Sequence, residues 1–188
     1  MRLLRYNLAP TLNGLIASLP SHTTPWIIDD PTIDFPALYA QFSTFIMGRR
    51  TYQAFLSQPE NPLDGFPKEK VVVFTRDGKW ESEWGDRVTV VGGGIVEFVR
   101  GLKGEGEGDK GDKDIWLMGG GEVAGVLMGA GLVDVVEAAI MPVVVGGGVG
   151  MFGVGGLGGS ENGWRLKLEK VEVLESGILM TRYSVLYG

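Results

Sequence analysis

The nine residues Asp114-Ile-Trp-Leu-Met-Gly-Gly-Gly-Glu122 decide the fold, because they join a buried strand to a helix through three consecutive glycines. An apolar-striped stretch, residues 123–130, follows directly. Glycines at such a corner let a backbone approach a phosphate closely, and the helix N-terminus offers free N–H groups and a positive dipole end. The segment is therefore typical of a site for an anionic cofactor, although a tight turn is the alternative in a chain with 31 glycines.

Length and composition indicate one domain. The chain has 188 residues, of which 44% are hydrophobic and 21% are charged. These fractions are ordinary for a soluble globular protein, and the length is enough to bury a substantial core. We expect a single domain over residues 1–188. Residues 104–113, rich in glycine and charge, have little to bury and are expected to form a mobile surface insertion.

Charge and the scarcity of metal-binding side chains exclude several functions. The net charge of -6 argues against a nucleic-acid surface, which needs clustered lysine and arginine. Cysteine is absent and His22 is the single histidine, so we expect no metal site and no Ser-His triad, and we interpret His22 as a loop residue. The chain has no signal-peptide pattern and no apolar run of membrane-spanning length, which predicts a soluble, cytoplasmic protein without a membrane partner.

Apolar and turn residues predict strands that alternate with helices. Val71-Val72-Val73-Phe74 is the clearest buried strand, and the proline-rich segment 20–36 suits an irregular active-site loop. Nine of the fourteen residues in 146–159 are glycine, so we expect a loop there that is flexible or very close to a ligand or another backbone. The expected strands are 3–8, 45–47, 71–74, 87–91, 114–118, 132–141, 164–169 and 178–186, and the expected helices are 35–42, 49–56, 95–102 and 123–130. The order predicts an α/β fold: a central, mostly parallel sheet with helices on both faces and a C-terminal antiparallel hairpin.

Three predicted strands end on residues that suit an anion. Gly48-Arg49-Arg50-Thr51, Thr75-Arg76 and Gly119-Gly120-Gly121 each follow a strand. Ligands of open parallel sheets bind outside the carboxyl ends of the strands, so the three corners are expected to share one crevice. Arginines at two separate corners suggest more than one phosphate group, which favours NADPH over NADH because an arginine commonly holds the 2′-phosphate. The alternative is that these arginines form surface ion pairs with the 23 acids of the chain.

Two better-known phosphate motifs fit poorly. Gly119, Gly121 and Ala124 satisfy the G-x-G-x-x-A pattern, but a Rossmann fingerprint follows the first strand of its unit, whereas this triplet lies in the second half of the chain. A P-loop is excluded because no Gly-Lys-Ser/Thr sequence follows the glycines. Trp116, on the strand before the glycines, is interpreted as a core or dimer-face residue rather than a ligand-stacking one.

Several motifs together resemble the dihydrofolate-reductase-like superfamily, and most closely the subgroup that contains the reductase domain of riboflavin biosynthesis. In order along nearly the whole chain they are Ile46-Met-Gly-Arg-Arg-Thr-Tyr52, Lys70-Val-Val-Val-Phe-Thr-Arg76, Ile115-Trp-Leu-Met-Gly-Gly-Gly-Glu-Val123, Gly131-Leu-Val-Asp134 and Pro142-Val-Val-Val-Gly-Gly-Gly148. The resemblance implies an NADPH-dependent reductase, often a homodimer.

The resemblance also implies roles for individual residues. Gly48, Arg49, Arg50 and Thr51 would line the adenosine and phosphate side of the cofactor, and Thr75 with Arg76 would hold the 2′-phosphate. Gly119, Gly120, Gly121, Glu122 and Val123 would cradle the pyrophosphate. Ala9 and residues 13–16, including Ile16, would lie beside the nicotinamide.

The proton donor is the least defined part of the site. Hydride transfer to a C=N or C=O bond needs an acid or a polarising group, and Asp34 is the nearest positional match to the acid of dihydrofolate reductases, with Asp29 and Asp30 as competitors. Asp34 also suits a helix cap before Phe35 and Pro36.

Two departures from the subgroup bear on activity. The chain has Thr11-Leu12-Asn13-Gly14 where the subgroup usually has Ser-Leu-Asp-Gly, and Val135 where an acid usually follows the aspartate. The sequence therefore predicts a reductase of a small pterin-like, pyrimidine-like or carbonyl substrate. The alternative is a non-catalytic nucleotide-binding domain that keeps the fold.

Overall fold

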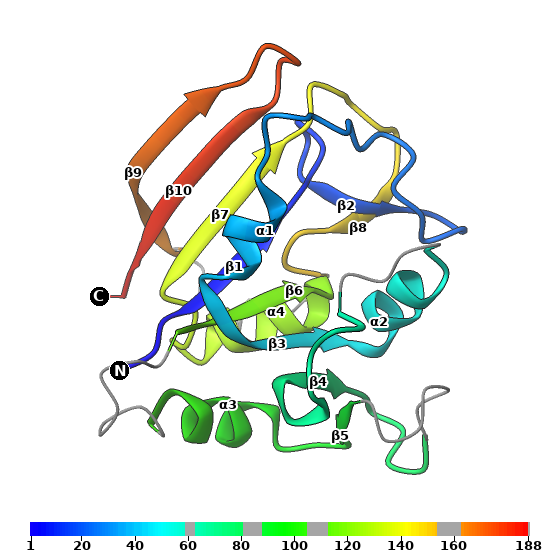
Figure 1. Ribbon diagram of the computed structural model, residues 1–188, viewed down its shortest axis with the longest axis vertical. Helices are drawn as coiled ribbons and strands as arrows, with labels where there is room; N and C mark the ends of the chain where they lie inside the picture. Colours follow the sequence, from blue (N-terminus) through cyan, green and yellow to red (C-terminus); the bar gives the residue numbers. More distant parts are fainter. Residues whose placement is uncertain (59–62, 81–87, 105–112, 154–162, 188) are drawn as a thin grey trace.

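The computed structural model describes residues 1–58, 63–80, 88–104, 113–153 and 163–187 of the chain, and most of the predicted insertion lies outside them. A central eight-stranded sheet organises the described part, in the order β5-β4-β3-β6-β1-β7-β10-β9 (Figure 1). Its strands are β1 (Leu4–Leu8), β3 (Phe42–Gly48), β4 (Val71–Phe74), β5 (Thr89–Val91), β6 (Asp114–Gly119), β7 (Val135–Ile140), β9 (Arg165–Val173) and β10 (Leu179–Leu186).

In the spatial order of the sheet, each strand from β5 through β4, β3, β6 and β1 to β7 is parallel to the next. β10 is antiparallel to both β7 and β9. The predicted mostly parallel sheet with a C-terminal hairpin is therefore confirmed. The boundaries differ where local pattern is weak. β3 begins three residues earlier than predicted, at Phe42, and β9 continues to Val173 because its pairing partner β10 is long.

Helices cover both faces of the sheet, as predicted. On one face, buried residues of α3 (Ile95–Gly104) and α4 (Gly121–Gly129) pack on Leu4, Ile46 and Leu117. On the other face, α1 (Phe35–Tyr39) and α2 (Arg49–Leu56) pack on a cluster around Phe45, Val73 and Trp116. In β3, β4 and β6 alternate residues enter the two cores, which is the two-residue period of a sheet covered on both sides.

A second, two-stranded sheet corrects one prediction. β2 (Leu15–Ser18) pairs antiparallel with β8 (Gly148–Gly150), so part of the segment expected to be a loop is a strand. A Cβ on Gly148 would lie 2.3 Å from the carbonyl oxygen of Ala17, so only glycine fits this approach. The glycines at this point serve the contact between two backbones, one of the two roles predicted for them.

The proline-rich segment is irregular as predicted, with no helix or strand between β2 and α1. Within the described ranges, none of the helices is both long enough and apolar enough to cross a membrane.

Candidate active site

One large cleft of about 1090 Å³ runs along the carboxyl ends of the parallel strands and over the adjoining face of the sheet. It contains every cofactor-binding residue predicted from the sequence, although these come from segments far apart in the chain. They are Ala9, Ile16, Gly48, Arg49, Arg50, Thr51, Thr75, Arg76, Gly119, Gly120, Gly121, Glu122 and Val123. The expected convergence of three strand ends in one crevice is therefore observed.

Two helix N-termini meet at one end of the cleft. Gly48 is the N-cap of α2 and Gly120 is the N-cap of α4, and neither helix has a side-chain cap. A Cβ on Gly120 would lie 3.4 Å from the backbone nitrogen of Gly48, so the two caps touch through their backbones. Gly120 has a φ of 91°, which a residue with a side chain rarely adopts. Uncapped first-turn N–H groups at paired helix termini are suited to phosphate oxygens.

The third glycine of the triplet has a different role. A Cβ on Gly121 would lie 2.2 Å from the carbonyl oxygen of Gly150 and 2.7 Å from the nitrogen of Gly153. Gly121 therefore lets the start of α4 pack against the segment that contains β8. Gly119 faces Thr51, because a Cβ there would lie 3.2 Å from both Cγ2 and Oγ1 of the threonine.

The arginines at this end form ion pairs and still line the cleft. Nη1 of Arg49 lies 3.7 Å from Oδ2 of Asp77, and Nη2 of Arg76 lies 3.3 Å from Oε2 of Glu122. The alternative predicted for these arginines, pairing with acids, is thus also observed. The Arg76 side chain is 88% exposed, and such solvent-exposed pairs contribute little stability, so an incoming phosphate can replace the carboxylate. Arg50 has no ion pair within the part of the chain that the structure describes.

Asp34 is the N-cap of α1, where its Oδ1 accepts a hydrogen bond of 2.9 Å from the backbone nitrogen of Ala37. Asp34, Asp29 and Asp30 are not among the described residues that line the cleft. The Oδ1 of Asp30 accepts hydrogen bonds from the nitrogen and hydroxyl of Thr32, which fixes the loop before α1. The capping role weighed for Asp34 is therefore observed, and its proton-donor role has no support from this geometry.

The other end of the cleft contains a charged group that the sequence reasoning missed. Glu137 on β7 accepts hydrogen bonds from Arg5 and Asn7 on β1 and from Arg182 on β10. All four residues line the cleft. The available signal was a charge within an apolar strand, since Arg5 and Glu137 interrupt strands that are otherwise mostly hydrophobic.

Aromatic side chains form a wall beside this group. The ring centroids of Tyr39 and Trp116 lie 5.2 Å apart, and both residues line the cleft. The indole N–H of Trp116 donates to the carbonyl oxygen of Asn7 at 3.0 Å, which fixes the ring plane. Trp116 is buried, as predicted for a core residue, but it also faces the cleft. His22, interpreted as a loop residue, lines the cleft from the irregular segment with a φ of 55°.

A family model described as the RibD C-terminal domain matches residues 2–180. The chain belongs to the RibD C-terminal domain family. One relative is YyaP, an uncharacterized protein of Bacillus subtilis (strain 168), which is 30% identical over 155 residues, or 78% of each chain. The family assignment confirms the resemblance inferred from the motifs.

Solved structures show the same fold. A protein from Shewanella sp. PV-4, described as a candidate riboflavin biosynthesis protein, matches over 100% of both chains with a TM-score of 0.77 and 23% identity. A pyrimidine reductase-like protein from Corynebacterium diphtheriae covers 100% of this chain and 93% of its own, with a TM-score of 0.70 and 17% identity. Dihydrofolate reductase from Enterococcus faecalis, solved with NADP(H), covers 97% of this chain and 94% of its own, with a TM-score of 0.59 and 18% identity. The dihydrofolate-reductase-like fold predicted from the sequence is therefore confirmed.

Proposed function

We propose that the protein is an NADPH-dependent reductase of a small heterocyclic or carbonyl substrate. The observation that carries the proposal is a single cleft with two distinct ends. One end joins two uncapped helix N-termini to three arginines, and the other combines an aromatic wall with a buried polar group. The first suits a dinucleotide with several phosphates, and the second suits a planar organic molecule.

The residues at the first end fit NADPH. The N-termini of α2 and α4 would bind the pyrophosphate through the backbone N–H groups of residues 49–51 and 121–123. Arg76 and Thr75 would bind the 2′-phosphate, with Arg50 available as a second cation. When bound, the cofactor would supply a hydride from C4 of its dihydronicotinamide to the carbon of a C=N or C=O bond, and the nitrogen or oxygen of that bond would take a proton from solvent water.

The substrate class is supported by the family and by the second end of the cleft. Two solved proteins with this fold are described as a pyrimidine reductase-like protein and a dihydrofolate reductase. Pyrimidines and dihydrofolate both contain a planar heterocycle. Trp116 and Tyr39 provide aromatic side chains in the cleft lining against which such a ring can pack.

A non-catalytic nucleotide-binding domain is the alternative, and Asn13 is its main support. The structure gives this asparagine a local role: its Nδ2 donates to the carbonyl oxygen of Val145 at 2.8 Å, and its Oδ1 accepts from the hydroxyl of Thr11 at 2.8 Å. An ionised aspartate cannot donate the first bond. Asn13 is also not among the described residues lining the cleft. Having asparagine at position 13 where the subgroup usually has aspartate therefore removes no carboxylate from the cleft. We therefore favour the reductase.

Cofactor titration followed by turnover tests the proposal. We expect NADPH to bind more tightly than NADH, and the NADPH absorbance to fall when pterin, pyrimidine-dione or quinone substrates are added. Tight binding without turnover across the panel would favour the alternative. Absence of binding by both cofactors at millimolar concentration would overturn both. The homodimer, the single domain and the cytoplasmic location stay predictions from the sequence.

A further inference from the structure

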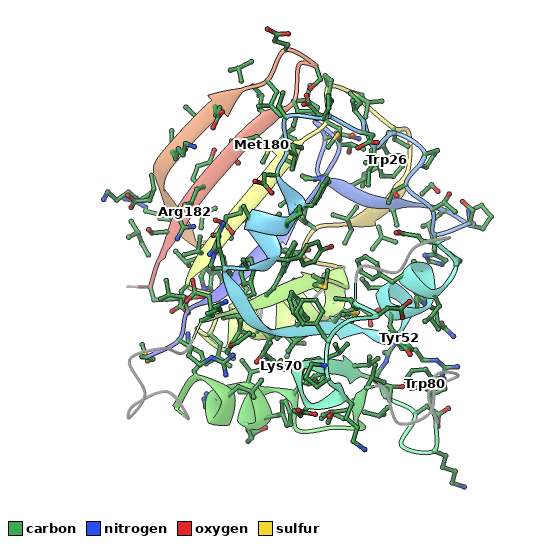
Figure 2. The ribbon with its side chains drawn as sticks, viewed as in Figure 1. Trp26, Tyr52, Lys70, Trp80, Met180 and Arg182 are labelled. Atoms are coloured by element: carbon green, nitrogen blue, oxygen red, sulfur yellow. The ribbon has the colours of Figure 1, made fainter. Side chains whose placement is uncertain are left out.

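A row of polar residues crosses four strands at the end of the cleft that contains Glu137 and Trp116, which we call the substrate end after its proposed role. Asn7 on β1 is in register with Glu137 on β7, Glu137 with Arg182 on β10, and Arg182 with Lys170 on β9. Residues in register point to the same face of a sheet, and all four line the cleft. Figure 2 labels Arg182 and Met180 on β10, two residues that share this face.

The carboxylate of Glu137 is already saturated. Its Oε2 accepts from Nε of Arg5 at 2.9 Å and from Nδ2 of Asn7 at 3.1 Å. Its Oε1 accepts from Nη2 of Arg5 at 2.7 Å and from Nη1 of Arg182. A carboxylate has about four lone-pair sites, so Glu137 has none left for a ligand. With a side chain only 13% exposed, it is also shielded from solvent.

Arg182 is the opposite case. A guanidinium has five N–H donors, and within the described residues Arg182 uses one of them, for Glu137. Its side chain is 35% exposed and lines the cleft. Glu137 thus fixes the guanidinium at one corner and leaves its other donors for a ligand. Because Arg182 is a donor only, the ligand group that it binds must be an acceptor.

These contacts give the substrate end a definite chemical preference. We propose that it binds a planar substrate through carbonyl or carboxylate oxygens held by Arg182, with Glu137 as a positioning residue and Trp116 beside the ring. A cationic 2,4-diaminopyrimidine, which needs a free carboxylate as its acceptor, is disfavoured, because Glu137 is occupied and Glu172, which also lines the cleft, is paired with Lys170 at 2.8 Å. The inference deepens the proposed function, but the binding itself requires neither NADPH nor turnover.

Calorimetric titration of the full chain without cofactor tests the preference directly. The probes are orotate, a planar pyrimidine-dione carboxylate, and 2,4-diaminopyrimidine. We expect orotate to bind and diaminopyrimidine to bind at least about tenfold more weakly. Equal affinity for the two probes, or stronger binding of diaminopyrimidine, would overturn the proposal.

Variants separate the roles of the two residues. Arg182→Met is expected to weaken orotate binding roughly tenfold or more, and Arg182→Lys to restore part of it through the retained charge. Glu137→Gln frees the corner of the guanidinium, so it is expected to weaken orotate binding less than Arg182→Met does. Arg100→Met removes an exposed arginine of α3 outside the cleft lining and is expected to change nothing.

The outcomes for binding and for reduction are independent. Unchanged orotate affinity in Arg182→Met, with folding verified by urea unfolding, would overturn the role of Arg182. Failure of the chain to oxidise NADPH, together with Arg182-dependent orotate binding, would contradict the reductase function and leave this inference standing.

Discussion

Arg5 on β1 holds the carboxylate of Glu137 on β7 through two parallel hydrogen bonds, from Nε to Oε2 at 2.9 Å and from Nη2 to Oε1 at 2.7 Å. The Arg5 side chain is 6% exposed, and its guanidinium lies 4.4 Å from the centre of the Phe42 ring. A second carboxylate, that of Asp114, lies 3.3 Å from Nη1 of Arg5. This pair, a buried arginine and a half-buried glutamate, joins β1 to β7 at the substrate end of the cleft.

Removing both partners of this pair is expected to cost less than the two single removals added together. Arg5→Met leaves Glu137 buried with fewer donors, and we expect it to lower the free energy of unfolding by about 3 kcal/mol. Arg5→Met combined with Glu137→Met is expected to lose less than the sum of the single losses, since it leaves no isolated charge from the pair. Urea unfolding of the four proteins measures the coupling. Additive losses would mean that the two side chains do not stabilise one another.

Two glycine-to-alanine changes in helices are expected to have opposite effects. In Gly121→Ala, at the start of α4, the new Cβ would lie 2.2 Å from the Gly150 carbonyl oxygen, so we expect a loss of about 1–3 kcal/mol of stability. Gly101→Ala in α3 is the matched control, because a Cβ there meets nothing within 4 Å. It is expected to gain about 0.5–1 kcal/mol from helix propensity. Thermal unfolding compares the two, and a neutral Gly121→Ala would contradict the close approach.

Arginine variants test the proposed 2′-phosphate contact. We expect Arg76→Ala to weaken NADPH binding roughly tenfold and to leave NADH binding nearly unchanged, because only NADPH carries the extra phosphate. Arg50→Ala is expected to weaken NADPH binding by a smaller factor and to leave NADH binding nearly unchanged, because Arg50 is proposed as the second cation at the 2′-phosphate. Fluorescence titration with each cofactor measures the ratio. An equal loss for NADPH and NADH in Arg76→Ala would place this arginine elsewhere on the cofactor.

Local sequence pattern was enough to predict the helices and strands in which neighbouring residues favour the same secondary structure. The helix of residues 49–56 and the strand of residues 71–74 have the predicted boundaries, because an amphipathic stretch after Gly48 and a β-branched run are strong local signals. The meeting of three strand ends in one cleft was predicted for a related reason. Gly48, Thr75 and Gly119 lie where parallel strands end, and parallel topology brings such ends together.

The substrate end was not predictable in the same way. The contact between Glu137 and Arg182 depends on the register of β10 against β7, which joins positions 45 residues apart and is set by the whole sheet. β8 was missed because the glycines predict a close approach to another backbone but do not identify β2 as the pairing strand. For Asp34, capping and catalysis call for the same residue type, so only the position of the side chain distinguishes them.

Alkaline pH is expected to destabilise the fold through Tyr187. Burial, and next the negative charge of Asp134, raise the pKa of this tyrosine to about 12, and its hydroxyl donates to the carbonyl oxygen of Val133 at 2.7 Å. The unfolded chain has a tyrosine pKa of about 10, so the contribution is complete below pH ~10 and is lost as the pH rises toward ~12. Urea midpoints from pH 8 to 11.5 are expected to converge for the wild type and Tyr187→Phe. A constant gap across this range would contradict the raised pKa.

Substitutions at Asp34 separate a helix cap from a proton donor. Asparagine caps a helix about as well as aspartate, so Asp34→Asn is expected to keep the stability of the protein, whereas Asp34→Ala is expected to lose about 1 kcal/mol. Because the carboxylate accepts from Ala37 and lies outside the described cleft lining, we expect both variants to keep the NADPH turnover of the wild type under conditions where they are folded. A loss of turnover in stable Asp34→Asn would instead assign the proton donor to this aspartate. A pH–rate profile with an acidic limb that disappears in the variant would give the same assignment, since the limb reports titration of the essential acid.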